Sequence, residues 1–217
     1  MPAPSVFFTL LLHLQLATSS SGKLREFRAA VARWVRLRYP SPALEIDLLP
    51  GFNSLPSCEE DADTFAGNAV KKALHYSQLA PGYVLADDSG IEVDFLHGAP
   101  GIYSRRFAGP TATDAENNSK LLRELQGVMH PQRTARFVCE LALAMNQQIV
   151  AQFRGAAEGV ILESPRGEAG FGYDPLFLDP VTGKTFAELS PEAKLERSHR
   201  GRAIQLMLAW LAAHPEL

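Results

Sequence analysis

The second half of the chain contains two long strand patterns with only a short gap between them. Residues 133–144 alternate in polarity, and residues 148–158 can pair with them across a turn at Asn146-Gln147. An antiparallel hairpin of this length excludes an all-helical fold. In the first half, strand patterns alternate with helical ones, as in parallel sheets. The two halves together predict a mixed α/β sheet with helices on its faces and a β-rich second lobe.

The first half begins with a strand expected within residues 8–17, where apolar and polar residues alternate from Leu12 to Leu16. The helix predicted after it has apolar residues at helical spacing, among them Leu24, Phe27 and Trp34. The other expected elements are a strand at 43–49, a helix at 64–79, a strand at 83–86 that ends in a loop at 87–90, a helix from the capping box Thr113–Glu116 to Leu125, and C-terminal helices after Ser190-Pro191.

The composition excludes several classes of protein. The 217 residues are 46% hydrophobic and 21% charged, with a net charge of −3, which predicts a single globular domain over residues 1–217 and excludes disorder and coiled coil. Because there is no overall basic field, we expect no nucleic-acid partner. Cys58 and Cys139 lack metal-site spacing and are expected to be free thiols in a reducing compartment, which favours the cytoplasm.

The N-terminal apolar run resembles a secretory signal in part. It extends from Val6 to Ala17, but no Lys or Arg precedes it, and His13 and Gln15 interrupt it. It is also shorter than the roughly 20 residues that cross a bilayer. We therefore interpret it as a buried strand and expect no membrane association. For Met1 to Phe7 two interpretations stay open, a flexible extension or a misassigned start codon. Secretion would require cleavage near Ala17, which would remove this strand.

One polar segment has features of an anion site. Thr18 to Ser21 are small polar residues, and Gly22 and Lys23 follow at the start of a predicted helix. Free N–H groups at a helix N-terminus and a nearby lysine attract phosphate. The standard P-loop is absent, because Leu178 stands where the motif before Gly183-Lys184-Thr185 needs a glycine. We interpret that second segment as a surface turn.

Asp87 and Asp88 end an apolar strand, where two carboxylates cost desolvation energy unless a cation is their partner. Neighbouring side chains of an extended chain point to opposite faces, so only one is expected to face a cleft while the other anchors the loop through backbone N–H groups. The first suits Mg²⁺, which usually takes one or two carboxylates. The acidic run Glu59 to Asp63 could add a ligand, or form a solvated cluster before the next helix.

The C-terminal third combines an aromatic residue with hydrogen-bond donors. Phe171 lies between two glycines, and Lys194 and the run Ser198-His199-Arg200-Gly201 follow. Glycines allow an aromatic ring to approach a flat ligand, and arginine and histidine offer donors. Taken singly, Phe171 is typical of a core residue, and His199 of a surface or capping residue.

Five segments together resemble the inosine/xanthosine triphosphate pyrophosphatases. They are residues 17–27 (ATSSSGKLREF), 64–73 (TFAGNAVKKA), 84–109 (VLADDSGIEVDFLHGAPGIYSRRFAG), 170–177 (GFGYDPLF) and 184–201 (KTFAELSPEAKLERSHRG). The resemblance extends from about Leu14 to Leu211. It implies an elongated mixed sheet with two lobes, a cleft between them that holds the active site, and a homodimer. It also implies Mg²⁺-dependent hydrolysis of ITP, dITP and XTP to the monophosphate and pyrophosphate, which cleanses the nucleotide pool.

The resemblance further implies roles for single residues. The triphosphate would contact Thr18, Ser19, Ser20, Ser21, Gly22, Lys23 and Lys72. Asp88 would be the general base and a metal ligand, Ser89 a substrate contact, and Glu59 or Glu60 a second metal ligand. The nucleoside would contact Phe171, Gly172, Tyr173, Asp174, Lys194, His199 and Arg200. Donors from Arg200 and the backbone near His199 suit O6 of hypoxanthine and xanthine, which adenine lacks.

The sequence departs from the family pattern at three positions. The family usually has asparagine at the position of Ser20, often glycine at Ser19, and commonly glutamate at Gly67. Ser20 keeps a hydroxyl but lacks the amide's simultaneous donor and acceptor. An alternative function is therefore a nucleotide-binding protein with weak or no turnover. A pyrophosphatase for modified pyrimidine nucleotides is a further alternative, which the retained residues 171–174 and 198–201 disfavour.

Overall fold

A computed structural model describes residues 12–37 and 44–217. The expected extension at residues 1–7 and the start of the strand expected within 8–17 lie outside the described residues. The strands are β1 (Leu12–Ala17), β2 (Leu44–Leu48), β3 (Tyr83–Val93), β4 (Thr134–Met145), β5 (Gln148–Ile161), β6 (Phe177–Asp179) and β7 (Lys184–Thr185). The helices are α1 (Ser21–Leu37), α2 (Phe65–Ser77), α3 (Asp114–Glu124), α4 (Pro191–Arg197) and α5 (His199–Ala213), with short 3₁₀ turns η1 (Phe52–Ser54), η2 (Asp94–Leu96), η3 (Gly101–Arg106) and η4 (His130–Gln132).

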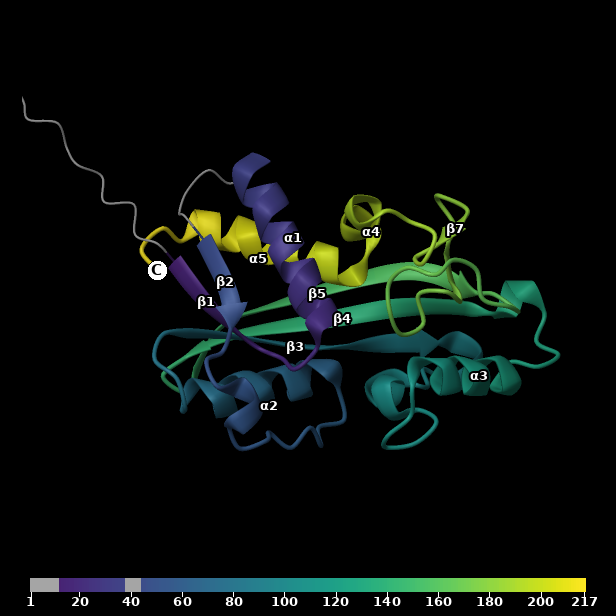
Figure 1. The fold of residues 1–217 in the computed structure, drawn as a ribbon, viewed down its shortest axis with the longest axis horizontal. Coiled ribbons are helices and arrows are strands. Elements are labelled where there is room, and N and C mark those ends of the chain that lie inside the picture. Colours follow the sequence, from purple (N-terminus) through teal and green to yellow (C-terminus); the bar gives the residue numbers. More distant parts are fainter. Residues whose placement is uncertain (1–11, 38–43) are drawn as a thin grey trace, which may run out of the picture.

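The described strands form one elongated mixed sheet in the order β2-β1-β3-β4-β5-β6-β7 (Figure 1). β1 runs parallel to β2 and β3, whereas β3 to β7 pair antiparallel. The predicted hairpin is confirmed, because β4 and β5 meet at Asn146 and Gln147, whose φ angles of 49° and 63° match a tight hairpin turn. The mixed α/β prediction is therefore confirmed.

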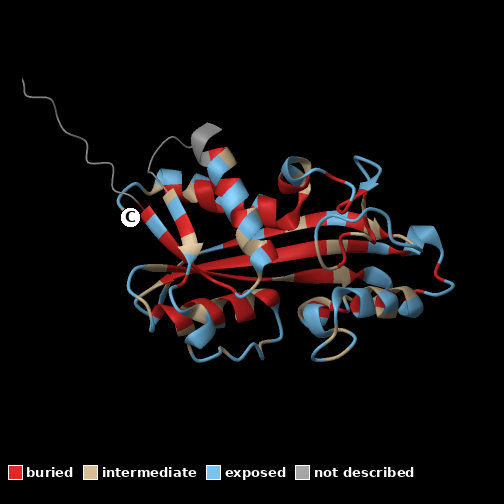
Figure 2. Ribbon diagram, in the orientation of Figure 1, coloured by how far each residue is buried: buried red, intermediate tan, exposed pale blue. Residues whose placement is uncertain are grey.

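Helices cover both faces of the sheet. Figure 1 shows α1, α4 and α5 on one face of the long strands and α2 and α3 on the other. The apolar spacing that predicted α1 buries Phe27 and Trp34 completely, and α5 buries Ile204 and Met207 against the same core. β3 and β4 are buried along most of their length (Figure 2), whereas buried residues of β5 alternate with exposed and half-buried ones over its second half. No helix within residues 12–37 and 44–217 has both the length and the apolarity needed to cross a bilayer.

Side-chain caps fix where the helices begin. The predicted capping box of α3 is present, since the Thr113 hydroxyl accepts from Glu116 N–H and the Glu116 carboxylate accepts from Thr113 N–H. Ser190 caps α4 before Pro191, as predicted, and Ser198 caps α5 by accepting from Gly201 N–H. These caps satisfy N–H groups that a helix leaves unpaired.

The expected loop at residues 87–90 is wrong, because β3 continues through it to Val93. The reason is pairing with β4, in which Asp87 lies opposite Leu141 and Asp88 opposite Glu140. Non-local pairing outweighs the loop preference of the local sequence. The expected alternation on opposite faces still holds, and it separates Asp87 from Asp88.

The second half of β3 has β4 on one side and η3 on the other. β1 pairs with β3 only as far as Ala17, opposite Ala86. Further along, Ile91 N–H donates to Ser104 Oγ at 2.9 Å, and a Cβ on Gly90 would overlap Ser104. Between the end of β1 and η3, the edge of β3 at Asp87 and Asp88 has no strand partner among the described residues, although both side chains are buried.

Candidate active site

The loop after β1 and the first turn of α1 form one ordered polar segment. Thr18 Oγ1 accepts from Ser20 N–H at 3.1 Å, and Ser20 Oγ accepts from Lys23 N–H at 3.3 Å. Ser20 therefore takes part in starting α1, a position that favours serine and asparagine alike. Ser19 and Ser21 are exposed beside it. Thr18 to Lys23, which are expected to contact a triphosphate, lie together here, whereas Lys72, expected to do the same, lies on α2.

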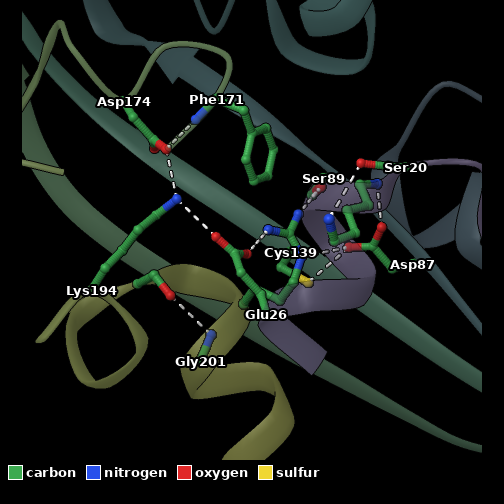
Figure 3. Close-up of polar contacts among 12 residues, drawn as sticks. Ser20, Glu26, Asp87, Ser89, Cys139, Phe171, Asp174, Lys194 and Gly201 are labelled. Carbon is green, nitrogen blue, oxygen red and sulfur yellow. Dashed lines mark hydrogen bonds and ion pairs between the residues drawn. The ribbon is translucent and has the colours of Figure 1, made fainter. Parts of the chain in front are cut away.

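Asp87 is buried on the face covered by α1 and α5. It forms an ion pair with Lys23, and Arg200 Nε lies 3.3 Å from Asp87 Oδ2, which also accepts from Cys139 Sγ at 3.4 Å (Figure 3). Burial alone would raise the pKa of Asp87, but Lys23 and Arg200 outweigh it and hold the pKa well below its usual range. The expected anchoring through backbone N–H groups is wrong for this residue, because side-chain cations hold it.

Asp88 lies on the opposite face, near α2. Asp88 Oδ1 accepts from Ser89 N–H at 3.0 Å, whereas Oδ2 is buried and has no partner among the described residues. Burial raises the pKa of Asp88 to about 6; Asp87 and Glu60 act in the same direction, and Lys72 opposes them. Asp88 therefore combines a free buried oxygen with a raised proton affinity.

Lys72 connects the two aspartates to the acidic run before α2. Its Nζ donates to Asp87 O at 3.1 Å and lies 3.1 Å from Glu60 Oε2. Burial lowers the pKa of Lys72, but Glu60, Asp88 and Asp87 together raise it above its usual range. Both glutamates left open by the sequence are exposed, and Glu60 is the one that pairs with Lys72.

Arg200 joins three elements of the fold. Besides Asp87, it pairs with Glu26 through Nη1 and donates from Nη2 to Ser89 Oγ at 2.7 Å. Burial would lower the pKa of Arg200, but Asp87 and Glu26 raise it, so its charge is fixed. Glu26 was not predicted as a site residue. The sequence feature that could have identified Glu26 is its position three residues after Lys23, which places both side chains on one face of α1.

Lys194 extends the network of ion pairs, which joins Lys23, Asp87, Arg200 and Glu26, to the loop that contains Phe171. Its Nζ lies 2.8 Å from Glu26 Oε1 and 2.6 Å from Asp174 Oδ2, and Asp174 Oδ2 also accepts from Phe171 N–H at 2.9 Å (Figure 3). Burial raises the pKa of Asp174 in spite of Lys194, whereas Arg200 and Lys194 outweigh burial and lower the pKa of Glu26. The expected nucleoside residues Lys194, Asp174 and Phe171 are therefore in direct contact.

The Phe171 ring lies between the two ends of the network. It is half-buried, and Lys194 Nζ lies 4.8 Å from its centroid. A Cβ added to Gly22 would lie 2.9 Å from Phe171 Cδ1, so the ring packs on the first turn of α1. Gly172 lies in the turn that follows, with a φ of 63°, and Tyr173 is buried.

His199 is a buried residue, which corrects its interpretation as a surface or capping histidine. Its ring stacks on Phe137 at a centroid distance of 4.7 Å, and Ser198 is the residue that caps α5. Burial lowers the pKa of His199 well below its usual range, and Arg200 and Lys194 add to the effect. The imidazole is therefore neutral at physiological pH.

No set of three or more His, Cys, Asp or Glu side chains is placed to hold a metal ion within the described ranges. Mg²⁺ does not need such a set, because it usually takes one or two carboxylates and completes its shell with water and substrate phosphate. Asp88, with its unpartnered buried oxygen, and Glu60 beside it fit that requirement. These two residues are the candidate Mg²⁺ ligands.

A hollow of about 550 Å³ lies on the α2 side of the sheet. Residues of the first turn of α2, the segment 98–103, Glu140 and Arg154 line it, and the residues expected to contact substrate do not. Glu140 is opposite Asp88 in the strand register, so the hollow adjoins the site.

The fold and this network define the class of protein, an α/β protein with a charged site. The site consists of ion pairs between lysine or arginine and carboxylate side chains. It lies where the parallel and the antiparallel parts of the sheet meet. The chain belongs to the Ham1 family, whose model matches residues 14–210. It is 47% identical over 189 residues to a dITP/XTP pyrophosphatase of Geobacillus kaustophilus, covering 87% of this chain and 89% of that protein.

Two solved structures are also similar. The Ham1 protein of Staphylococcus aureus aligns with a TM-score of 0.80 and 35% identity, covering 93% of this chain and 99% of that one. A HAM1 protein from Coxiella burnetii has the same TM-score and coverage with 39% identity. The family resemblance inferred from the sequence motifs is therefore confirmed.

Proposed function

We propose that this protein hydrolyses ITP, dITP and XTP to the nucleoside monophosphate and pyrophosphate, and so removes non-standard purine nucleotides from the nucleotide pool. The observation that carries the proposal is the continuous network from Lys23 through Asp87, Arg200, Glu26 and Lys194 to Asp174, which joins the expected triphosphate end to the expected nucleoside end. The relative from Geobacillus kaustophilus is named for hydrolysis of the same class of substrate.

In the proposed reaction, water attacks a phosphorus atom of the substrate and the bond between the α- and β-phosphates breaks. Asp88 orients the attacking water and accepts its proton; in the metal-free chain its Oδ2 has no partner among the described residues and burial raises its pKa to about 6. Mg²⁺, when bound by Asp88 and Glu60, would neutralise phosphate charge and polarise the water. Lys23 and Lys72 would stabilise the remaining negative charge on the phosphates.

The residues at the nucleoside end favour binding of purines that have an oxygen at position 6. A base beside Phe171 would meet N–H donors of Lys194 and Arg200, whose charges lie 4.8 and 5.8 Å from the ring centroid. Hypoxanthine and xanthine present an acceptor there, whereas the amino group of adenine would leave a buried donor unpaired. Such a mismatch corresponds to roughly 100-fold rejection or more.

We also propose that the protein works in the cytoplasm as a homodimer. Cytoplasmic location agrees with the two free thiols, Cys58 and Cys139. The homodimer follows from the family resemblance. Light scattering on purified protein tests it, and a mass near 23.7 kDa would contradict it.

The deciding experiment measures pyrophosphate release from ITP, XTP, dATP and GTP, with and without Mg²⁺. The wild type is compared with Asp88→Asn and with the control Asp61→Asn, which removes an exposed carboxylate of the same acidic region. We expect release from ITP and XTP that requires Mg²⁺, disappears in Asp88→Asn and persists in Asp61→Asn. Absence of release while ITP still raises the melting temperature would contradict the proposal and support a binding protein without turnover.

A further inference from the structure

Helix α3 holds the peptide groups on both sides of Gly172. Gly172 N–H donates to Asp114 Oδ2 at 2.6 Å, and Asn118 Nδ2 donates to Gly172 O at 3.0 Å. Asp114 and Asn118 lie one helical turn apart on the same face of α3, 58 and 54 residues from Gly172 in sequence. One side chain accepts and the other donates, so the pair matches the peptide groups of a single residue.

This contact fixes the direction of the neighbouring side chains. Gly172 has a φ of 63°, in the left-handed region that favours glycine, so the turn places Phe171 and Tyr173 on different sides of the loop. Phe171 packs on Gly22, while Tyr173 OH donates to Ser104 O at 2.8 Å. If Gly172 were free to rotate, the Phe171 ring would lose its fixed position over Lys194.

Helix α3 is itself fixed against the segment that lines the edge of β3. Asn117 Nδ2 donates to Arg105 O at 3.0 Å, and its Oδ1 accepts from Ala108 N–H at 2.8 Å. Lys120 Nζ donates to Phe107 O at 2.7 Å. The polar residues of α3 thus connect residues 105–108, beside β3, to the loop that contains Phe171.

We propose that Asp114 and Asn118 are positioning residues that set the affinity for the nucleoside by holding Gly172 and, through it, the Phe171 ring. This inference rests on the proposed function. Neither side chain needs to touch substrate. Their contribution is pre-organisation of the base platform, which reduces the ordering cost of binding.

Single substitutions at Asp114 and Asn118 test the two hydrogen bonds. Asn118→Asp puts a carboxylate oxygen against Gly172 O, and Asp114→Ala removes the acceptor for Gly172 N–H. Asp114→Asn keeps an acceptor oxygen and serves as the conservative rescue variant. Ser119→Ala is the matched control on α3, because the hydrogen bond that its hydroxyl makes among the described residues stays within the helix, to Ala115 O.

We expect Asn118→Asp and Asp114→Ala to raise KM for ITP about fivefold to tenfold, the equivalent of one hydrogen bond, with kcat within about twofold of wild type. Product inhibition by IMP should weaken by a similar factor while inhibition by inorganic pyrophosphate stays unchanged, because only the nucleoside end is affected. Asp114→Asn and Ser119→Ala should behave as wild type.

Three results would overturn the inference: wild-type KM in both damaging variants, a fall in kcat at unchanged KM, or equal weakening of IMP and pyrophosphate inhibition. Urea unfolding of each variant identifies general loss of the fold. Failure of the proposed function is a separate outcome, because it appears already in the wild type as absent ITP hydrolysis.

Discussion

Arg200 Nη2 donates to Ser89 Oγ at 2.7 Å, although 111 residues separate the two in sequence. The same guanidinium binds Asp87 and Glu26, so a single side chain at the start of α5 joins β3 to α1. Arg200 is almost completely buried, and its charge is compensated only by these two carboxylates among the described residues. Substitution of this site residue is therefore expected to change the stability of the fold as well as the site.

Replacement of Arg200 by methionine is expected to destabilise the protein strongly. Methionine replaces only the apolar stem of arginine and leaves the charge of buried Asp87 compensated only in part, which costs about 3–5 kcal/mol. Urea unfolding followed by circular dichroism measures this loss. Arg200→Lys should lie between wild type and Arg200→Met, because an ammonium cannot make the same forked contacts. Equal stability of all three proteins would show that Arg200 does not compensate Asp87.

Gly22→Ala is expected to weaken the affinity for ITP without an equal loss of unfolding free energy. Its Cβ would lie 2.9 Å from Phe171 Cδ1 and push the ring aside, so KM for ITP should rise. The same change puts a better helix former in the first turn of α1, so the free energy of unfolding should not fall in step with the affinity. Steady-state kinetics and urea unfolding check the two effects, and an unchanged KM would refute the role of the Phe171 ring.

His199 predicts a specific dependence of stability on pH. Burial lowers its pKa in the folded chain, Arg200, Lys194 and Lys23 act in the same direction, and Asp87 opposes them. Below about pH 6.5 the unfolded chain takes up a proton that the folded chain does not, so His199 destabilises the fold as pH falls, by at most about 1.4 kcal/mol per pH unit.

Unfolding free energies of wild type and His199→Gln at pH 7.5 and pH 5.5 test this dependence. The wild type should lose more stability than the variant between the two values. An equal loss in both proteins would mean that the buried ring takes up a proton without cost.

Ser20 is expected to act mainly through the start of α1. Ser20→Ala removes the acceptor for Lys23 N–H and should cost about 1 kcal/mol of unfolding free energy. Ser20→Asn keeps a capping oxygen and adds a donor for phosphate, so stability should be unchanged and kcat/KM for ITP equal to or above wild type. Lower turnover in Ser20→Asn would show that the rest of the site depends on the smaller hydroxyl.

Local patterns in the sequence predicted most elements of the fold. The alternation in residues 133–144 and the capping residues Thr113 and Glu116 are local signals, and the structure confirms the elements that they predicted. The extension of β3 through residues 87–90 was missed because Asp, Ser and Gly favour loops, and only pairing with β4 makes them a strand.

The site was predicted unevenly for the same reason. The structure brings together Lys23, Asp174, Lys194 and Arg200, which motifs had singled out. Asp114 and Asn118 carry no motif of their own, because their role depends on a contact with a loop more than 50 residues away. The burial of His199 likewise depends on packing of α5 against Phe137, which no local pattern reports.

The four cations of the proposed site already have carboxylate partners within the chain. Lys23 pairs with Asp87, Lys72 with Glu60, and Lys194 and Arg200 share Glu26. Such a site exerts little long-range attraction on a bare polyanion, and the encounter rate should depend only weakly on ionic strength. The protein would then select nucleotides after contact, by exchange of ion-pair partners, instead of collecting them from a distance.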